Sequence, residues 1–515
     1  MRGDALKASA PVVALGATGL ITFGTLSATM MQALDTTIAN VALPHMQGSL
    51  SASQEQVAWV LTSYIVASAI ATTPTGYLAN RYGVKRIFLI AVAGFTIASM
   101  LCGIASSLTE IVFFRLLQGV FGAALVPLSQ TTLLDTYPPE KQGSAMAAWG
   151  VGVMIGPIIG PALGGWLTEY YSWRWVFYIN LPIGIATFFA LKAALPDSEP
   201  RRSAPMDFTG FLFLSVAIAS LQLMLDRGQS LDWFQSTEIM VECGLAIAAM
   251  YLFVVHTMTT DKPFISPSLF KDRNLVGGLV IIAMLGIVLF STFALLPPFL
   301  QRLQGYPVIT AGLVMAPRGI GTMIAMQISG HILSRVDARL PILVGMLLLA
   351  YALNWMSNFT ADVGAQEIVL SGMVQGLGLG FIFVPLSAVT FSTLAPEFRG
   401  DGTSLYSLLR NVGSSVGIAL AFAYQDYGTK MAHSVLAENV NAFNPALIEY
   451  VNSSNGLNGV NALLGVESEL QRQSAVMGML GDFHYMALGV LCAIPMLLFL
   501  RPGRLGKSNH DAVMD

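Results

Sequence analysis

Charged residues are scarce in this chain of 515 residues. Only 11% are Asp, Glu, Lys or Arg, whereas soluble domains carry about 25%. The three cysteines, Cys102, Cys243 and Cys492, lie far apart in apolar stretches, so neither a disulfide framework nor a cysteine metal site is expected. The sequence has no phosphate-binding glycine loop, zinc-ligand spacing or basic nucleic-acid face. These absences argue against a metalloenzyme, a protein driven directly by ATP and a nucleic-acid-binding protein.

Long apolar stretches indicate the class of the chain. Hydrophobic residues make up 54% of the sequence, and apolar runs of about 20 residues, enough for a helix to cross a bilayer, recur along almost all of it. A transmembrane β-barrel would instead show short segments of alternating hydropathy. We therefore predict an all-α polytopic membrane protein with fourteen transmembrane helices. The expected spans lie near 13–43, 56–79, 85–105, 110–135, 145–167, 175–195, 207–226, 238–257, 275–298, 308–333, 340–357, 366–393, 401–424 and 484–500.

Lysine and arginine residues orient these spans. With the N-terminus in the cytoplasm, 18 of the 26 basic residues fall in cytoplasmic loops and tails and five in outer loops. The other three, Arg115, Arg318 and Arg410, lie inside spans. Because cytoplasmic loops carry the excess of positive charge, both termini are predicted to be cytoplasmic.

The two halves of the chain repeat one another. Gln118-Gly119 recurs as Gln375-Gly376, and Gly156 and Gly160 recur as Gly413 and Gly417, all at an offset of 257 residues. Repeats of the same orientation indicate two bundles related by an axis along the membrane normal, with substrate bound between them. We expect an N-terminal six-helix bundle at 1–200, two inserted helices at 201–262 and a C-terminal six-helix bundle at 263–515, which includes an outer loop at 425–483.

Several motifs resemble one known family, the fourteen-helix drug:proton antiporters of the major facilitator superfamily, and within it the EmrB-type inner-membrane subunits of tripartite pumps. The stretches that carry the resemblance are "LDTTIANVALP" (34–44), "GYLANRYGVKR" (76–86), "IVFFRLLQGVFGAA" (111–124), "GVGVMIGPIIGPALGG" (150–165) and "SLQLMLDRGQSLDWFQS" (220–236). The resemblance covers essentially the whole chain.

The resemblance implies a multidrug efflux transporter of the bacterial inner membrane. Such a protein exports small hydrophobic or amphipathic drugs by alternating access, and a proton gradient supplies the energy without a cofactor. It also implies two protein partners: a periplasmic membrane-fusion adaptor that docks on the loop at 425–483 and, through it, an outer-membrane channel. The surrounding lipid bilayer is the remaining partner, and no nucleic acid is expected.

Two of the motifs assign residues to conformational roles. Cytoplasmic gating is expected of Gly76, Arg81, Gly83 and Arg86, together with the second cluster Arg335, Asp337 and Arg339. Asn80 stands where the family usually has aspartate, which argues against an aspartate-based latch there. The antiporter motif on the fifth helix contains Gly152, Gly156, Pro157, Gly160, Pro161 and Gly164. Its glycines form a smooth stripe at i+4 spacing, and we expect a bent helix at which the two bundles meet and pivot.

Asp35 and Arg115 are the strongest candidates for proton coupling. Ionisable groups at membrane depth are rare and commonly functional. A carboxyl group at Asp35 could take up a proton from the outer side and release it inward, with Arg115 as its partner if the first and fourth helices pack together. The competing explanations are a structural aspartate and a fixed ion pair.

Further polar and aromatic residues could line a substrate cavity: Gln32, Asn40, Trp59, Tyr64, Gln130, Phe383, Arg410 and Asn411. Arg410 and Arg318 could each face an anionic substrate, neutralise a carboxylate or bind a loop carbonyl. No catalytic or metal-binding cluster is recognisable.

Three other functions stay open from the sequence. A narrow-specificity exporter of a fatty acid, siderophore or metabolite would have the same architecture. A membrane-embedded transferase would need a polar catalytic cluster at one interface, which is not visible. A receptor would need a sizeable soluble output domain, and the terminal segments are short.

Overall fold

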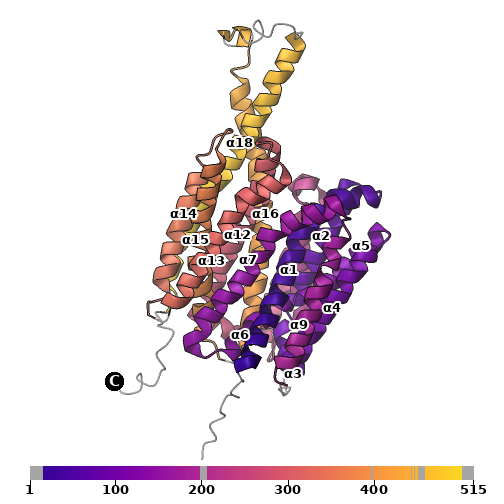
Figure 1. Ribbon diagram of the computed structural model, residues 1–515, viewed down its shortest axis with the longest axis vertical. Coiled ribbons are helices and arrows are strands. Elements are labelled where there is room, and N and C mark those ends of the chain that lie inside the picture. Colours follow the sequence, from indigo (N-terminus) through magenta and orange to yellow (C-terminus); the bar gives the residue numbers. More distant parts are fainter. Residues whose placement is uncertain are drawn as a thin grey trace, which may run out of the picture.

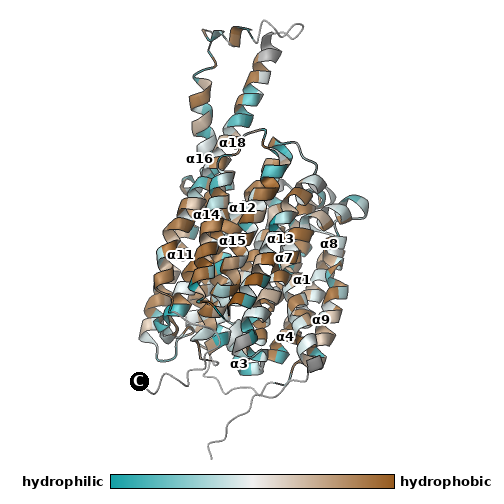
Figure 2. Cartoon of the chain, turned by 60° about the vertical axis from the view of Figure 1, so that its left-hand side comes forward, coloured by the Kyte–Doolittle hydropathy of each residue, from teal (hydrophilic) through white to brown (hydrophobic). Residues whose placement is uncertain are grey.

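The computed structural model describes residues 15–197, 206–333, 335–395, 398–441, 443–445, 447–449 and 459–501. Over these residues the chain is helical and contains no β-strand. The helices pack side by side into one bundle, from which the ends of two helices project as a hairpin (Figure 1). Hydrophobic residues predominate along the body of the bundle, hydrophilic residues are more frequent at its ends, and the hairpin carries both kinds (Figure 2).

Helices α1 to α9 form one side of the bundle in Figure 1. They are α1 (Leu15–Ser49), α2 (Gln54–Thr72), α3 (Thr75–Tyr82), α4 (Val84–Ile104), α5 (Leu108–Gly122), α6 (Leu125–Thr136), α7 (Pro139–Tyr170), α8 (Trp175–Tyr178) and α9 (Asn180–Ala194). Two further helices follow, α10 (Phe208–Arg227) and α11 (Thr237–Thr259), joined by the short turns η1 (Gln229–Leu231) and η2 (Trp233–Gln235). We call α10 and α11 the inserted pair.

The remaining helices form the other side of the bundle. They are α12 (Arg273–Pro298), α13 (Val308–Ile332), α14 (Arg339–Met356), α15 (Ala365–Ser392), α16 (Arg399–Ala437) and α18 (Gly459–Ala493). Three short elements accompany them: η3 (Pro267–Lys271), the π-helical turn η4 (Phe299–Leu303) and η6 (Ile494–Leu498).

Helix starts and breaks follow local sequence signals. Ser53 and Gln56 form a capping box at α2, and the Asp272 carboxylate accepts backbone hydrogen bonds at the start of α12. Helices α2 and α3 meet at a bend of 52°, where Pro74 cannot donate a backbone hydrogen bond. Gly83 has φ = 91° and allows the chain to turn sharply from α3 into α4.

Eleven helices of the described part are long and apolar enough to cross a membrane, and twelve if the bent pair α2–α3 is one span. The protein is therefore a polytopic helical membrane protein, as predicted. The number fourteen stays a prediction. Both chain ends and the expected bundle boundary at residue 200 lie outside the described residues.

The segment 425–483, expected to form an outer loop, is largely helical in its described residues. Helix α16 continues to Ala437 and α18 already begins at Gly459, so most of this segment extends the two helices. A β-carbon added at Gly428 would lie 3.0 Å from the Cα atom of Gly478, which shows that the helices approach closely there. The glycines at this contact permit the close approach. The resulting packing stabilises α16 and α18 beyond the apolar residues that cross the membrane. Hydropathy alone predicts the last span at 484–500, whereas α18 begins at Gly459.

We refer to the two ends of the bundle as the hairpin end and the base. The hairpin end is the one from which α16 and α18 project. The base is the opposite end, where α3, the end of α6 and the start of α16 lie (Figure 1).

Candidate functional site

Asp35 on α1 and Arg115 on α5 form an ion pair inside the bundle. The Arg115 Nη1 atom lies 2.6 Å from Asp35 Oδ2, and both side chains are 0% exposed. The contact expected between these two residues is therefore present. The two residues of such a buried pair depend on each other, because removal of either partner leaves an uncompensated charge in an apolar setting.

The Asp35 carboxylate also accepts hydrogen bonds from two amides. Gln118 Nε2 donates to Oδ1 over 2.8 Å, and Asn180 Nδ2 donates to the same oxygen over 3.2 Å. Asn180 lies on α9 and also donates to Ser99 Oγ on α4 over 3.0 Å. Four helices of the same side of the bundle thus position one carboxylate.

Arg115 has partners other than Asp35. Its Nε atom donates to the Val60 carbonyl over 3.1 Å, and Nη1 donates to Gln118 Oε1 over 2.9 Å. The guanidinium carbon lies 4.2 Å from the centre of the Tyr64 ring. Within the described part of the chain its Nη2 atom has no partner. The guanidinium therefore has hydrogen bonds and a ring contact that do not depend on the Asp35 carboxylate.

Sequence reasoning missed Gln118, Asn180 and Ser99 as members of this site. Gln118 carried a usable signal, since it lies three residues after Arg115 on the same helical face and recurs as Gln375 in the repeat. Asn180 and Ser99 are isolated polar residues in apolar helices. Only the packing of α9 against α1 and α4 brings Asn180 to Asp35 and Ser99 to Asn180.

The residues predicted to line a cavity do not gather at one place. Tyr64 belongs to the Asp35 site. Asn40 is exposed, and its side chain donates to the Thr36 carbonyl. The Trp59 ring lies beside Arg227 of the inserted pair, at 5.3 Å. Phe383 is buried and stacks on Trp149 with 5.7 Å between ring centres.

The other four predicted residues have mixed surroundings. Gln32 is half-buried on α1. Gln130 on α6 is fully buried, and neither its amide nitrogen nor its oxygen has a partner among the described residues. Arg410 is buried on α16, and Asn411 beside it is half-buried. The cavity-lining role of these residues remains a prediction.

The glycine stripe of α7 faces α1, which corrects the expected meeting of two bundles along it. A β-carbon at Gly156 would lie 2.6 Å from backbone atoms of Ala33 and Leu34, and one at Gly160 2.2 Å from Thr37 Oγ1. Gly164 lies against Ile38 in the same way. The stripe therefore fixes α7 to the helix that carries Asp35. Pro157 and Pro161 lie within the uninterrupted helix.

A different face of α7 packs across the bundle against α13. The Ile158 side chain occupies the space in which a β-carbon at Gly319 would lie. Gly150 lies against the Met326 side chain, and Gly143 lies near Leu333. Helix α7 thus connects the two sides of the bundle, but the residues that make this contact lie outside the glycine stripe.

The predicted gating residues lie at the base. A β-carbon at Gly76 would lie 2.4 Å from Asp401 Oδ1 and 2.6 Å from the Gly400 carbonyl carbon, so α3 and α16 touch through glycine. Arg81 and Arg86 are exposed, and Arg81 donates to Tyr77. In the second cluster, Asp337 accepts from the Arg339 backbone N–H and Arg335 is exposed.

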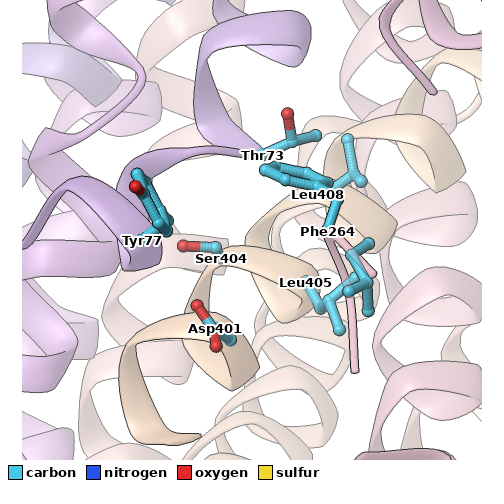
Figure 3. A pocket seen from close by; sticks show the side chains of 8 residues that line it. Thr73, Tyr77, Phe264, Asp401, Ser404, Leu405 and Leu408 are labelled. Atoms are coloured by element: carbon cyan, nitrogen blue, oxygen red, sulfur yellow. The ribbon is translucent and has the colours of Figure 1, made fainter. Parts of the chain in front are cut away.

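Polar contacts also join the two sides at the base. Arg399 Nη1 on α16 lies 2.8 Å from Asp135 Oδ1 on α6, and the Thr131 and Thr403 hydroxyls are 2.9 Å apart. Beside them is a small pocket between α3 and α16 (Figure 3). It is lined by Thr73, Tyr77, Phe264, Ile265, Asp401, Ser404, Leu405 and Leu408. The base is therefore closed in this conformation.

We expect Gly76→Val to hold the base open. The added side chain would meet the α16 backbone, which cannot move aside as a flexible side chain can. A cysteine placed at Ser404, in a variant without the three native cysteines, should then react several-fold faster with a thiol reagent. Gly244→Val is the control, because a β-carbon there meets nothing within 4 Å. Equal reaction rates in the two variants would contradict a glycine-mediated closure.

Polar contacts attach the inserted pair to its neighbours. Thr62 on α2 donates to the Asp226 carboxylate at the end of α10. Before α10, Asp207 accepts from the backbone N–H groups of Gly210 and Phe264 and contacts His256 Nε2 at 2.9 Å. Partial burial opposes the charged form of Asp207, but these hydrogen bonds outweigh it and lower its pKa. Neither Asp207 nor its contact with His256 was predicted.

Searches against known proteins give a consistent result. Residues 25–418 match the family model of the Major Facilitator Superfamily. The multidrug export protein EmrB of Haemophilus influenzae is 34% identical over 504 residues, which cover 97% of this chain and 99% of that protein. The fatty acid resistance protein FarB of Neisseria gonorrhoeae is 35% identical over 478 residues, covering 92% and 94%. The crystal structure of the human organic anion transporter MFSD10 is 12% identical, with a TM-score of 0.60, covering 93% of this chain and 98% of that one; this likeness concerns the fold alone.

Proposed function

This chain belongs to the Major Facilitator Superfamily, and we propose that it is a multidrug exporter that exchanges its substrates for protons. It is a transporter rather than an enzyme. The observation that carries proton exchange is the fully buried pair of Asp35 and Arg115. No cofactor takes part in this proposal, because the proton gradient supplies the energy.

Protonation would alter the pair directly. A proton on Asp35 removes the negative charge that holds the Arg115 guanidinium, which then keeps its contacts with Val60, Gln118 and the Tyr64 ring. The two charge states of the site thus favour different positions of α5 relative to α1. Because Gly156 and Gly160 fix α7 to α1, a displacement of α1 is passed to α7 and from there to α13. Through these contacts, protonation of Asp35 would be coupled to the movement of the two sides of the bundle relative to each other.

The topology of the proposal has fourteen spans. Helix α1 has 35 residues and α13 has 25, which at about 1.5 Å per residue exceed the roughly 30 Å of the hydrocarbon core. Both lie beside spanning helices, α1 against α7 and α13 against α15. Two six-helix bundles, at 1–200 and 263–515, would then flank the inserted helices at 201–262.

The base is placed in the cytoplasm in this proposal. Basic residues gather there, among them Arg81, Arg86, Arg335, Arg339 and Arg399, as the positive-inside rule requires. The hairpin end then faces the periplasm, both termini are cytoplasmic and the protein lies in a bacterial inner membrane. The closed base of this conformation corresponds to a cytoplasmic side closed to substrate.

The decisive test of the function is transport by the purified chain in proteoliposomes. An imposed proton gradient should drive accumulation of hydrophobic and amphipathic drugs against their own gradient, and a protonophore should abolish it. Accumulation that persists with the protonophore would refute proton exchange.

A narrow-specificity exporter is the second candidate, because the relative FarB is named for fatty acid resistance. A substrate panel in an efflux-deficient host distinguishes the two. Resistance to chemically unrelated drugs supports multidrug export, whereas resistance confined to fatty acids supports the narrow alternative.

We further propose that the hairpin is the docking site of a periplasmic adaptor, which connects the exporter to an outer-membrane channel. The hairpin projects from the bundle (Figure 1). Its helix α16 bears exposed apolar residues such as Tyr427, Met431 and Val435. Exposed apolar side chains beyond the membrane commonly mark protein interfaces.

Shortening the hairpin should separate docking from transport. We expect replacement of residues 430–475 by a short linker to abolish co-purification of the adaptor, because the projecting surface is removed. Drug transport in liposomes should persist, since the Asp35 site lies in other helices. Unchanged adaptor binding would contradict the docking proposal.

A further inference from the structure

The internal repeat contains an incomplete copy of the Asp35 site. At the offset of 257 residues, Gln375 corresponds to Gln118 and Thr292 corresponds to Asp35. The contact between them is kept, because Gln375 Nε2 donates to Thr292 Oγ1 over 3.2 Å where Gln118 donates to Asp35 over 2.8 Å. Both Gln375 and Thr292 are fully buried. The copy thus retains the hydrogen-bonding frame but has a hydroxyl in place of the carboxylate.

An arginine is present in the copy as well, but another helix supplies it. The position equivalent to Arg115 is Gly372 on α15. A β-carbon at Gly372 would lie 3.7 Å from the β-carbon of Arg318, which α13 brings to this region. The Arg318 guanidinium lies 4.2 Å from the centre of the Phe293 ring, and its Nη2 atom donates to the Leu289 carbonyl over 3.4 Å.

Arg318 and Gln375 contact the same face of α12. Leu289, Thr292 and Phe293 follow the i, i+3, i+4 spacing that places side chains on one face. Arg318 lies against the first and last of these residues, and Gln375 against the middle one. One cation and one amide therefore contact neighbouring residues of α12 in a buried region.

Buried polar atoms of this region lack partners. Arg318 is 3% exposed, and in the described part of the chain its Nε and Nη1 atoms and the Gln375 Oε1 atom have no hydrogen-bond partner. No ion pair of Arg318 is found there either, in contrast to Arg115. A buried guanidinium without a counter-charge is strongly disfavoured, so an anion in reach of its free N–H groups would be bound favourably.

We propose that this region, formed by Arg318, Thr292 and Gln375, binds one anionic group during transport. The Nε and Nη1 atoms of Arg318 are the free N–H donors for this group. The Thr292 hydroxyl, which donates to the Val288 carbonyl, stands where the Asp35 carboxylate stands in the other copy. The group is either the acidic head of an amphipathic substrate or an inorganic anion such as chloride. The inference rests on the proposed export function and adds to it a chemical class of ligand.

Binding to the purified full-length chain in nanodiscs tests the proposal. The probes are 2-naphthoate, its uncharged counterpart 2-naphthamide, and chloride. We expect Arg318→Gln to weaken naphthoate binding by about tenfold or more and to leave naphthamide binding unchanged, because the lost interaction is with charge. Arg318→Lys should recover part of the affinity. Arg302→Gln, an exposed arginine on η4, is the control and should bind naphthoate as the unmodified chain does.

Chloride distinguishes the two sources of the anion. If the anion is a substrate head group, naphthoate binds equally in chloride and in gluconate. If it is inorganic, chloride competes with naphthoate and raises the melting temperature of the unmodified chain, but not that of Arg318→Gln. Unchanged naphthoate affinity in Arg318→Gln, or an equal loss for naphthoate and naphthamide, would overturn the site. Proton-driven export of an uncharged drug is measured in parallel, so failure of the site is separable from failure of the exporter.

Discussion

Asp35→Asn is expected to abolish proton-driven drug accumulation, lowering the initial rate by about 100-fold or more, the scale of a lost acid–base group. Asparagine keeps the size of the side chain and an acceptor oxygen, but it cannot take up or release a proton. Drug exchange down its own gradient, which needs no proton, should persist. The measurement is uptake into proteoliposomes with and without an imposed pH gradient.

This variant leaves the Arg115 charge buried and unpaired, which costs about 3–5 kcal/mol in comparable pairs. Poor folding could therefore imitate lost coupling. The double variant Asp35→Asn with Arg115→Gln removes the orphaned charge and should regain stability without regaining proton drive. Asp482→Asn is the matched control, because Asp482 is a buried carboxylate on α18 outside the site. Normal proton-driven accumulation by Asp35→Asn would remove Asp35 from the mechanism.

The effects of Ala substitutions in the glycine stripe on stability and transport should depend on which atom each new β-carbon contacts. At Gly156 it would lie 2.6 Å from the backbone of α1, which can yield only if the helix shifts. At Gly152 the nearest atom is the Leu26 carbonyl oxygen at 3.4 Å, an ordinary contact. We expect Gly156→Ala to cost about 1–3 kcal/mol, as overpacking does, and to displace Asp35, so that transport falls at least about tenfold.

Gly152→Ala should be nearly neutral. Gly160→Ala should fall between the two, because the atom in its way, Thr37 Oγ1, belongs to a side chain. Gly156→Leu and Gly160→Leu should block transport altogether. Melting temperature in detergent and uptake rate in liposomes measure both effects. The same loss of transport in Gly152→Ala and Gly156→Ala would show that the stripe is not a steric contact with α1.

The sequence allowed the central pair to be predicted, but not its surroundings. Asp35 and Arg115 stand out because ionisable groups are costly in apolar helices, and two of opposite charge have an obvious reason to meet. Asn180 and Ser99 carry no such cost, so nothing in a single sequence separates them from incidental polar residues. Their role depends on the rotation of α4 and α9 about their axes, which is set by packing.

The glycine stripe shows a related limit. Its spacing correctly indicates that a helix approaches closely, but small residues do not identify the neighbour. Helix α1 and helix α13 both pack on α7, and the larger Ile158 of α7 lies against Gly319 of α13. The hairpin shows a second limit. The length of an apolar stretch indicates where a helix leaves the membrane, but it does not indicate where the helix itself ends.

The side chain of Ile158 in the notch at Gly319 has a consequence for drug design. In the proposed movement of the two sides relative to each other, this side chain would be withdrawn and would leave an empty, apolar notch at Gly319. Empty notches of this kind bind small apolar molecules, because filling them restores lost packing. A compound shaped to the vacated notch would trap the transporter in one conformation without competing for the substrate. Such an inhibitor would be insensitive to which drug is being exported, and resistance to it would arise from changes in side-chain volume rather than in charge.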